Sequence, residues 1–203
     1  MLFRSGDQGA RLLQIGPTQR VADSHSGFDV FIDIPQGNGR FDTAVNPANT
    51  GSGAISVGSV TNAAPWVPDN YTLAFTSAGN WQITDTATPT PNVVASGAYT
   101  SGAAISFNGA QIAITGTPAT GDTFSINQSR NENIFTTLRG IVDALEQPAG
   151  NATAYAKLSS SLNGSLQQLD QASDHLLGVR AQVGSRLRSE EHTSELQSQN
   201  RIS

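Results

Sequence analysis

The feature that most constrains this fold is a change of hydrophobic period near Arg130. Before that point, apolar residues alternate with polar ones in short runs, which is typical of strands buried on one face. After it they recur at helical spacing, and from Tyr155 to Val183 at every seventh residue. The sequence therefore predicts an α+β fold, an antiparallel β-rich domain followed by a helical hairpin with a coiled-coil-like stalk.

The alternating runs are expected to form an antiparallel meander. Asn108–Gly109 lies between two of them and is a strong hairpin signal, because both turn residues tolerate positive φ. The other turns contain Gly, Pro and Thr. The expected strands are Tyr71–Ser77, Trp81–Thr86, Asn92–Thr100, Ala103–Phe107, Ala110–Thr115 and Asp122–Asn127.

The first part of the chain has weaker signals. Arg11–Ile15 and Phe28–Ile34 are expected to be strands, each stopped near a proline. The glycine-rich stretch 50–59 is expected to be a loop with one weak strand. Ala63–Pro68 contains two prolines and is predicted to be a rigid connection.

Two helices are expected after Arg130. Asn131 or Asn133 can cap the first, which ends before Pro148, and the second runs from Ala152 to Leu187. The first carries an apolar side formed by Ile134, Leu138, Ile141, Val142 and Leu145. The second helix carries a column of residues at heptad spacing: Tyr155, Leu162, Leu169, Leu176 and Val183. A second column lies three residues after the first and consists of Leu158, Ser165, Ala172 and Val179. Leu166 and Leu187 widen the resulting stripe.

The heptad spacing fits two arrangements equally well: a coiled coil, or an amphipathic helix packed on its own β domain. Length separates them, because at ~1.5 Å per residue the first helix is roughly 24 Å long and the second roughly 54 Å. Uncovered leucines would forfeit several kcal/mol of burial energy, taking about 1.5–3 kcal/mol for each. We therefore expect a helix absent from this sequence to cover the stripe. The candidate assembly residues are Leu162, Leu166, Leu169, Leu176, Val179, Val183 and Leu187.

The last stretch, RSEEHTSELQSQNRIS, has no apolar face. It resembles the in-frame translation of a sequencing-library adapter, and a solvated native helix end is the alternative. The expected division is therefore 1–128 as a β-rich outer domain, 129–187 as a helical stalk and 188–203 as a non-native tail. On this interpretation the chain is a fragment that lacks both ends.

The chemistry of the sequence argues against several classes of function. The net charge is −5 and Lys157 is the only lysine, so nucleic acid is not an expected partner. No apolar run is long enough for a membrane, and no cofactor or metal is expected. His25, beside Ser24 and Ser26, is expected to lie in a solvated turn rather than a catalytic triad, and His175 on the polar side of the long helix. No enzyme is predicted.

Several stretches in order resemble the flagellin superfamily, closest to its hook-associated proteins. They are GDQGARLLQIG (6–16), SGFDVF (26–31), ISFNGAQIAITGTPATGDTFSI (105–126), FTTLRGIVDALEQP (135–148) and LDQASDHLLGVRAQVGSRL (169–187). The resemblance implies a structural flagellar subunit at the hook–filament junction, exported unfolded without a cleavable signal peptide. It also implies that the missing helix is N-terminal to this sequence, and that other flagellar subunits and an export chaperone are partners.

Two alternatives stay open. One is a flagellin that builds the bulk of the filament. The other is a β-rich adhesin or carbohydrate-binding module that uses Trp66 and Trp81, although core packing is the preferred interpretation for both tryptophans.

Overall fold

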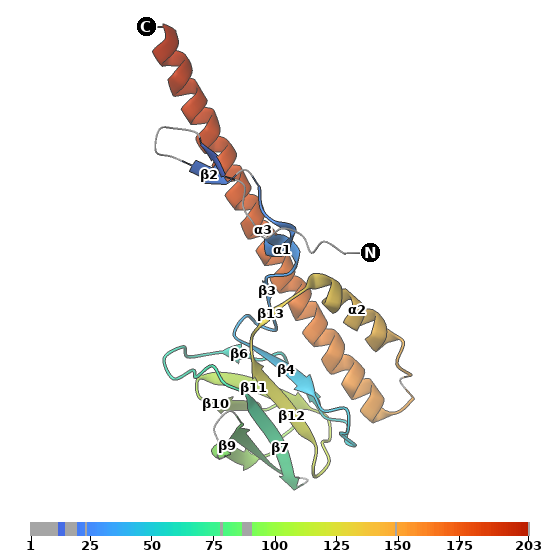
Figure 1. Ribbon diagram of the computed structural model, residues 1–203. Coiled ribbons are helices and arrows are strands. Elements are labelled where there is room, and N and C mark those ends of the chain that lie inside the picture. Colours follow the sequence, from blue (N-terminus) through green and yellow to red (C-terminus); the bar gives the residue numbers. More distant parts are fainter. Residues whose placement is uncertain are drawn as a thin grey trace.

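The structure, a computed structural model, describes residues 12–14, 20–22, 24–77, 79–86, 91–148 and 150–202, and the side chains of the last helix as far as Arg188. A β domain, a helical hairpin beside it and a long projecting helix make up the molecule (Figure 1). The fold is α+β, as predicted.

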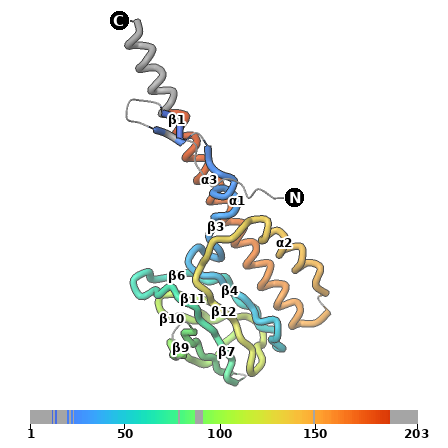
Figure 2. The backbone as a smooth tube through the Cα atoms, in the orientation of Figure 1, coloured from blue at the N-terminus to red at the C-terminus, as the bar shows by residue number. Residues whose placement is uncertain are grey.

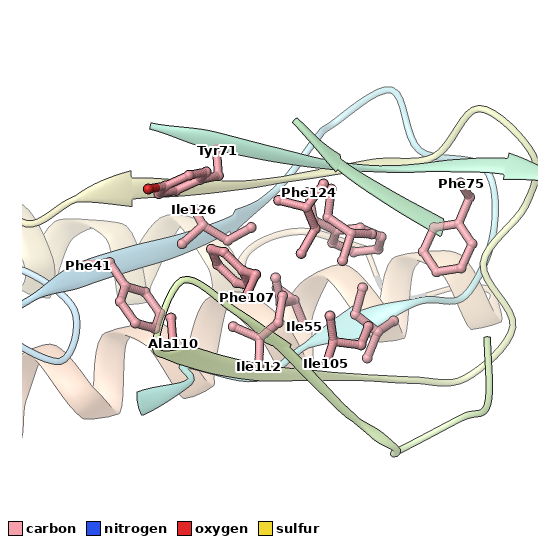
Figure 3. Close-up of a cluster of buried hydrophobic side chains, with 13 residues drawn as sticks. Phe41, Ile55, Tyr71, Phe75, Ile105, Phe107, Ala110, Ile112, Phe124 and Ile126 are labelled. Atoms are coloured by element: carbon pink, nitrogen blue, oxygen red, sulfur yellow. The ribbon is translucent and has the colours of Figure 1, made fainter. Parts of the chain in front are cut away.

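The β domain consists of two antiparallel sheets. One has five strands in the order β4-β12-β7-β8-β9, and the other joins β10, β11 and β5, with β6 also on β11. The bounds are β4 Phe41–Val45, β5 Ala54–Ile55, β6 Ser59–Val60, β7 Tyr71–Ser77, β8 Asn80–Asp85, β9 Asn92–Ala98, β10 Ala104–Phe107, β11 Ala110–Thr115 and β12 Thr123–Gln128. Their inward-facing side chains form one hydrophobic core, part of which is shown in Figure 3.

Alternation in the sequence accounts for this core. In β7, Tyr71, Leu73 and Phe75 are buried while the residues between them are not. Leu73 lies opposite Ile83 of β8 and Phe124 of β12, so three strands bury the same face. Asn108 and Gly109, both with positive φ, form the predicted turn between β10 and β11.

Of the predicted meander, the consecutive pairs β7–β8, β8–β9 and β10–β11 are correct. β10 and β11 move to the second sheet, and β12 returns to pair with β7 and β4. β4 was not predicted from the sequence. Within 50–59 one weak strand was expected, and the structure has β5 and the start of β6 there.

The N-terminal segment differs from expectation in one element. Leu12–Gln14 (β1) pairs with Arg20–Ala22 (β2), in agreement with the first expected strand. The expected strand at 28–34, however, is wrong: Gly27–Phe31 is a short helix, α1, followed by β3 (Ile34–Pro35). Ser26 caps α1 by accepting a hydrogen bond from the Asp29 amide at 3.1 Å, and this local bond outweighs the period-two alternation.

Two helices complete the chain. β13 (Asn131–Glu132) pairs with β3 and leads into α2 (Ile134–Leu145), which Asn133 caps at the Phe135 amide, one of the two predicted caps. α3 spans Ala152–Ile202 and continues past Leu187, where the apolar stripe was expected to stop. Figure 2 shows α3 passing the β domain with α2 beside its first part and α1 beside a later part. None of the helices within the described ranges is long and apolar enough to cross a membrane.

Candidate assembly surface

The side of α3 that faces the rest of the molecule is polar. Thr153 Oγ1 donates to the Thr50 carbonyl at 2.8 Å and Lys157 Nζ to the Pro47 carbonyl at 2.7 Å. Ser160 Oγ accepts from the Ile55 amide at 3.1 Å. These contacts fix the start of α3 to the β domain.

The same side continues further along the helix. Gln168 accepts from the Gly37 amide at 2.9 Å and donates to the Pro35 carbonyl at 3.2 Å. His175 contacts the Asp29 carbonyl, and Arg186 donates to the Ala22 carbonyl at 3.3 Å. We call these α3 residues, Thr153, Lys157, Ser160, Gln168, His175 and Arg186, the polar seam.

Every partner of the polar seam is a backbone group between residues 22 and 55. Ser160 and Gln168 are buried there, and both are satisfied. Sequence analysis treated His175 as part of a solvated polar side and missed the seam. The only sequence signal was that these polar residues, separated by 4, 3, 8, 7 and 11 positions, share one side of a helix. Such a pattern is equally typical of a helix face in water.

From Leu169 onward, α3 was expected to have no partner within this sequence, but the structure shows that the N-terminal segment covers part of it. The N-terminal segment runs back along the helix, and α1 packs on it. As a result Ala172 is buried and Val179 is half-buried. The column Leu158, Ser165, Ala172 and Val179 is thus at least partly covered by this chain itself.

The opposite side of α3 is open. Of the predicted assembly residues, Leu162, Leu169 and Val179 are half-buried. Leu166, Leu176, Val183 and Leu187 are exposed, with Leu166 at 59% and Leu187 at 57%. Tyr155 and Leu177 are exposed as well. We call Tyr155, Leu162, Leu166, Leu169, Leu176, Leu177, Val183 and Leu187 the apolar stripe; from Tyr155 to Leu187 it extends about 48 Å along the axis.

Helix α2 adds further exposed apolar side chains. Its buried residues are Thr137 and Ala144, which line the space between α2, α3 and β4. The apolar side predicted for this helix therefore faces largely outward. The exposed side chains are Phe135, Leu138, Val142 and Leu145. The ring of Phe135 lies near that of Phe31 of α1, with ring centroids 6.1 Å apart.

A groove of about 950 Å³ lies between the α2–α3 hairpin and β4. Asp42, Glu132, Asp143 and Lys157 contribute charges to its lining. Burial raises the pKa of the Asp42 carboxyl above 3.8, and the nearby charge of Glu132 adds to the rise, while a hydrogen bond from the Thr43 backbone opposes it. In the part of the chain that the structure describes, no group of three or more His, Asp or Glu residues could hold a metal ion.

The remaining candidate residues have structural positions. His25 precedes the cap of α1, and its Nε2 atom is buried, so the expected solvated turn is wrong; Asp23 lies outside the described residues. Trp66 packs 5.3 Å from Phe41 between ring centroids, and Trp81 donates from Nε1 to the Ala98 carbonyl at 3.1 Å. Both tryptophans pack against the β-domain core, which confirms the preferred interpretation.

Comparisons with known proteins agree with this architecture. The family described as flagellar hook-associated protein 1, D2-like domain, matches residues 44–128 of the β domain. No curated protein sequence matches the chain significantly.

Solved structures match almost the whole chain. The crystal structure of FlgL from Xanthomonas campestris is 29% identical with a TM-score of 0.87, over 97% of this chain and 63% of that one. The flagellar junction protein FlgL from Legionella pneumophila is 35% identical with a TM-score of 0.85, over 97% and 63%. Another structure from that organism, of flagellar hook-associated protein 3, is 35% identical with a TM-score of 0.88, over 97% and 62%.

The chain thus spans about 63% of the length of these FlgL structures. Its β domain, its hairpin and its long helix all correspond to theirs, and the matched family covers the β domain independently. The chain is similar to the flagellar hook-associated proteins over nearly its whole length and has the fold of FlgL.

Proposed function

We propose that this chain is part of a structural subunit that joins the hook of the bacterial flagellum to its filament. The observation that carries the proposal is the agreement of nearly the whole chain with FlgL structures at 29–35% identity. The subunit acts by assembly rather than catalysis, in keeping with relatives that are flagellar structural proteins. Its position outside the cell, its export without a cleavable signal peptide and its use of an export chaperone are parts of the same proposal.

The apolar stripe is the proposed packing surface. Solvent-exposed leucines at heptad spacing are stable only when another helix covers them, and burying each contributes about 1.5–3 kcal/mol. The FlgL structures are longer than this chain, so their additional length offers a source for a covering helix. In the proposal a helix preceding residue 1 covers the stripe, while other flagellar subunits contact the remaining surface.

Each part of the chain has a role in this proposal. Residues 1–128 form an outer domain, 129–187 form the stalk, and 188–203 are an adapter-derived tail. Sequencing the gene beyond the codons for Gly6 and Leu187 tests the last point. A genomic reading frame that continues through RSEEHTSELQS would contradict the adapter origin.

A chimera tests the function. Residues 12–187 replace the matched segment of Legionella pneumophila FlgL, which keeps its own additional helices. We expect the chimera to attach filaments to hooks and to restore swimming in a strain without its own FlgL. Adding Leu166→Glu and Leu187→Glu should abolish attachment, because charge on the stripe prevents helix packing.

Asn163→Glu is the matched control, since Asn163 is an exposed residue of α3 outside the stripe. Full attachment by the double Glu variant would overturn the proposed role of the stripe. A purified chimera that polymerises alone into long filaments would instead favour the flagellin alternative.

A further inference from the structure

One charged residue, Arg180, lies beside the residues of the apolar stripe. Arg180 lies fourteen positions after Leu166 and seven before Leu187, so the three share one heptad column. Its neighbours one turn away on α3 are Leu176, Leu177, Val183 and Gly184. Arg180 is exposed, and among the described residues it has no hydrogen-bond or ion-pair partner.

The charged side chains of α3 around Arg180 are all positive. From Leu176 to Arg188, α3 carries three arginines and no carboxylate. Of these, Arg186 is bound to the Ala22 carbonyl and belongs to the polar seam. The nearest carboxylates on α3 are those of Asp174, six residues before Arg180, and of Asp170 and Glu190, ten residues before and ten residues after it. Along the axis these separations are about 9 Å and about 15 Å.

We infer that the helix covering the apolar stripe carries a glutamate or aspartate opposite Arg180, and that this pair sets its register. The inference rests on the proposed function of the stripe and specifies the chemistry of its partner. Charged residues that flank an apolar heptad seam form ion pairs between helices and select partner and alignment. A basic residue at that level would instead face the like charge of Arg180, with Arg188 about 12 Å further along the helix.

The acidic residues also disfavour the wrong register. A partner displaced by one heptad toward the start of α3, a shift of about 10 Å, would bring its carboxylate beside Asp174 and Asp170. Like charges at that distance repel, whereas the correct alignment gives an attractive pair. The leucine positions alone would accept both alignments, because the heptad repeat is unchanged by the shift.

Two synthetic helical peptides test the inference against the whole 203-residue chain. Both peptides have the same leucine-lined seam. In one half of the helix, the positions that flank the seam are glutamate in one peptide and lysine in the other. All other flanking positions are glutamine in both peptides. We expect the glutamate peptide to bind about three- to ten-fold more tightly at low salt, a ratio set by attraction against repulsion at an exposed pair. Raising the salt concentration should reduce the ratio.

The variant Arg180→Glu should reverse the preference, while Arg40→Glu, an exposed arginine of the β domain, should leave it unchanged. Equal binding of both peptides would overturn the inference and leave the stripe intact as a docking surface, with Arg180 only extending its stem over the leucines. Failure of both peptides to bind would overturn the stripe as a docking surface, and the inference with it.

Discussion

The backbone amide of Gly37 donates a hydrogen bond to the side chain of Gln168, 131 residues later in the chain, at 2.9 Å. Gln168 is only 5% exposed and returns a second bond to the Pro35 carbonyl. The long helix therefore holds the turn before β4 through one amide side chain. Only a residue with both a donor and an acceptor can make this pair of contacts.

Gln168→Leu should lower the free energy of unfolding by about 2 kcal/mol or more, since it leaves the buried Gly37 amide and the part-buried Pro35 carbonyl without this partner. Urea denaturation followed by circular dichroism measures the change. Gln182→Leu is the control, because Gln182 is an exposed residue of the same helix and should change the stability little. Equal effects of both substitutions would show that the polar seam does not hold the N-terminal segment.

Asp122 organises the turns at one end of the β domain. Its carboxylate is 2% exposed and accepts hydrogen bonds from the amides of Thr50, Gly51 and Ala119. Asp122→Ala should cost about 3 kcal/mol or more, because bonds to a charged acceptor contribute about 1.5–3 kcal/mol each and the amides would lose their partner. Calorimetric melting should show a large fall in Tm for Asp122→Ala and almost none for Asp170→Ala, an exposed carboxylate on α3.

Two glycines make a matched pair with opposite expected signs. Gly109 has a positive φ, and a Cβ added there would lie 2.2 Å from the Asn62 carbonyl oxygen, so Gly109→Ala should destabilise the chain by more than about 1 kcal/mol. Gly140 lies within α2, and a Cβ there meets nothing within 4 Å, so Gly140→Ala should stabilise it by about 0.5–1 kcal/mol. Chemical denaturation of both variants measures the change in the free energy of unfolding, which should be a decrease for Gly109→Ala and an increase for Gly140→Ala. A loss of stability in Gly140→Ala would mean that the α2–α3 hairpin needs more room than the structure shows.

The buried carboxyl of Asp42 should make the free energy of unfolding fall as the pH rises from acid toward neutral. Burial raises the pKa of its carboxyl above 3.8, so the folded chain binds the proton more readily than the unfolded one. The stabilising contribution of the proton is complete below pH 3.8 and is lost as the pH rises through the folded pKa. Asp42→Asn should therefore stabilise the chain at neutral pH, with the gain disappearing in acid.

Unfolding measured across this pH range tests the sign. Glu132→Gln should lower the pKa of the Asp42 carboxyl, because it removes the charge that adds to the shift. A stabilising effect of Asp42→Asn that grew as the pH fell would contradict the assignment.

The features of this fold that could be predicted are those set by residues close together in the sequence. Alternation in Tyr71–Ser77 and Ala110–Thr115 predicted those strands with their observed ends, because side-chain burial in a strand follows directly from sequence order. Asn133 predicted the start of α2 for the same reason, since a cap involves only its neighbours. The sheet order could not be predicted, because β12 pairs with strands far away in the chain.

The candidate surface was predictable on one side only. Heptad spacing identified the leucines of the apolar stripe except Leu177, and their role in assembly stays a prediction. The polar seam was missed because Ser160 and Gln168 bind backbone groups, which every residue carries and no sequence pattern marks. Backbone contacts also explain why the return of the N-terminal segment along α3 was not expected.

Hydrogen exchange along α3 tests the central claim most directly, namely that the apolar stripe is one half of an interface. With the 203-residue chain monomeric, we expect the amides from Leu176 to Arg188 to exchange much faster than those of β7 and β12, because few contacts hold that part of the helix. In the FlgL chimera the same amides should become protected. A monomeric chain whose amides from Leu176 to Arg188 are as protected as those of β7, with nothing bound, would contradict the account.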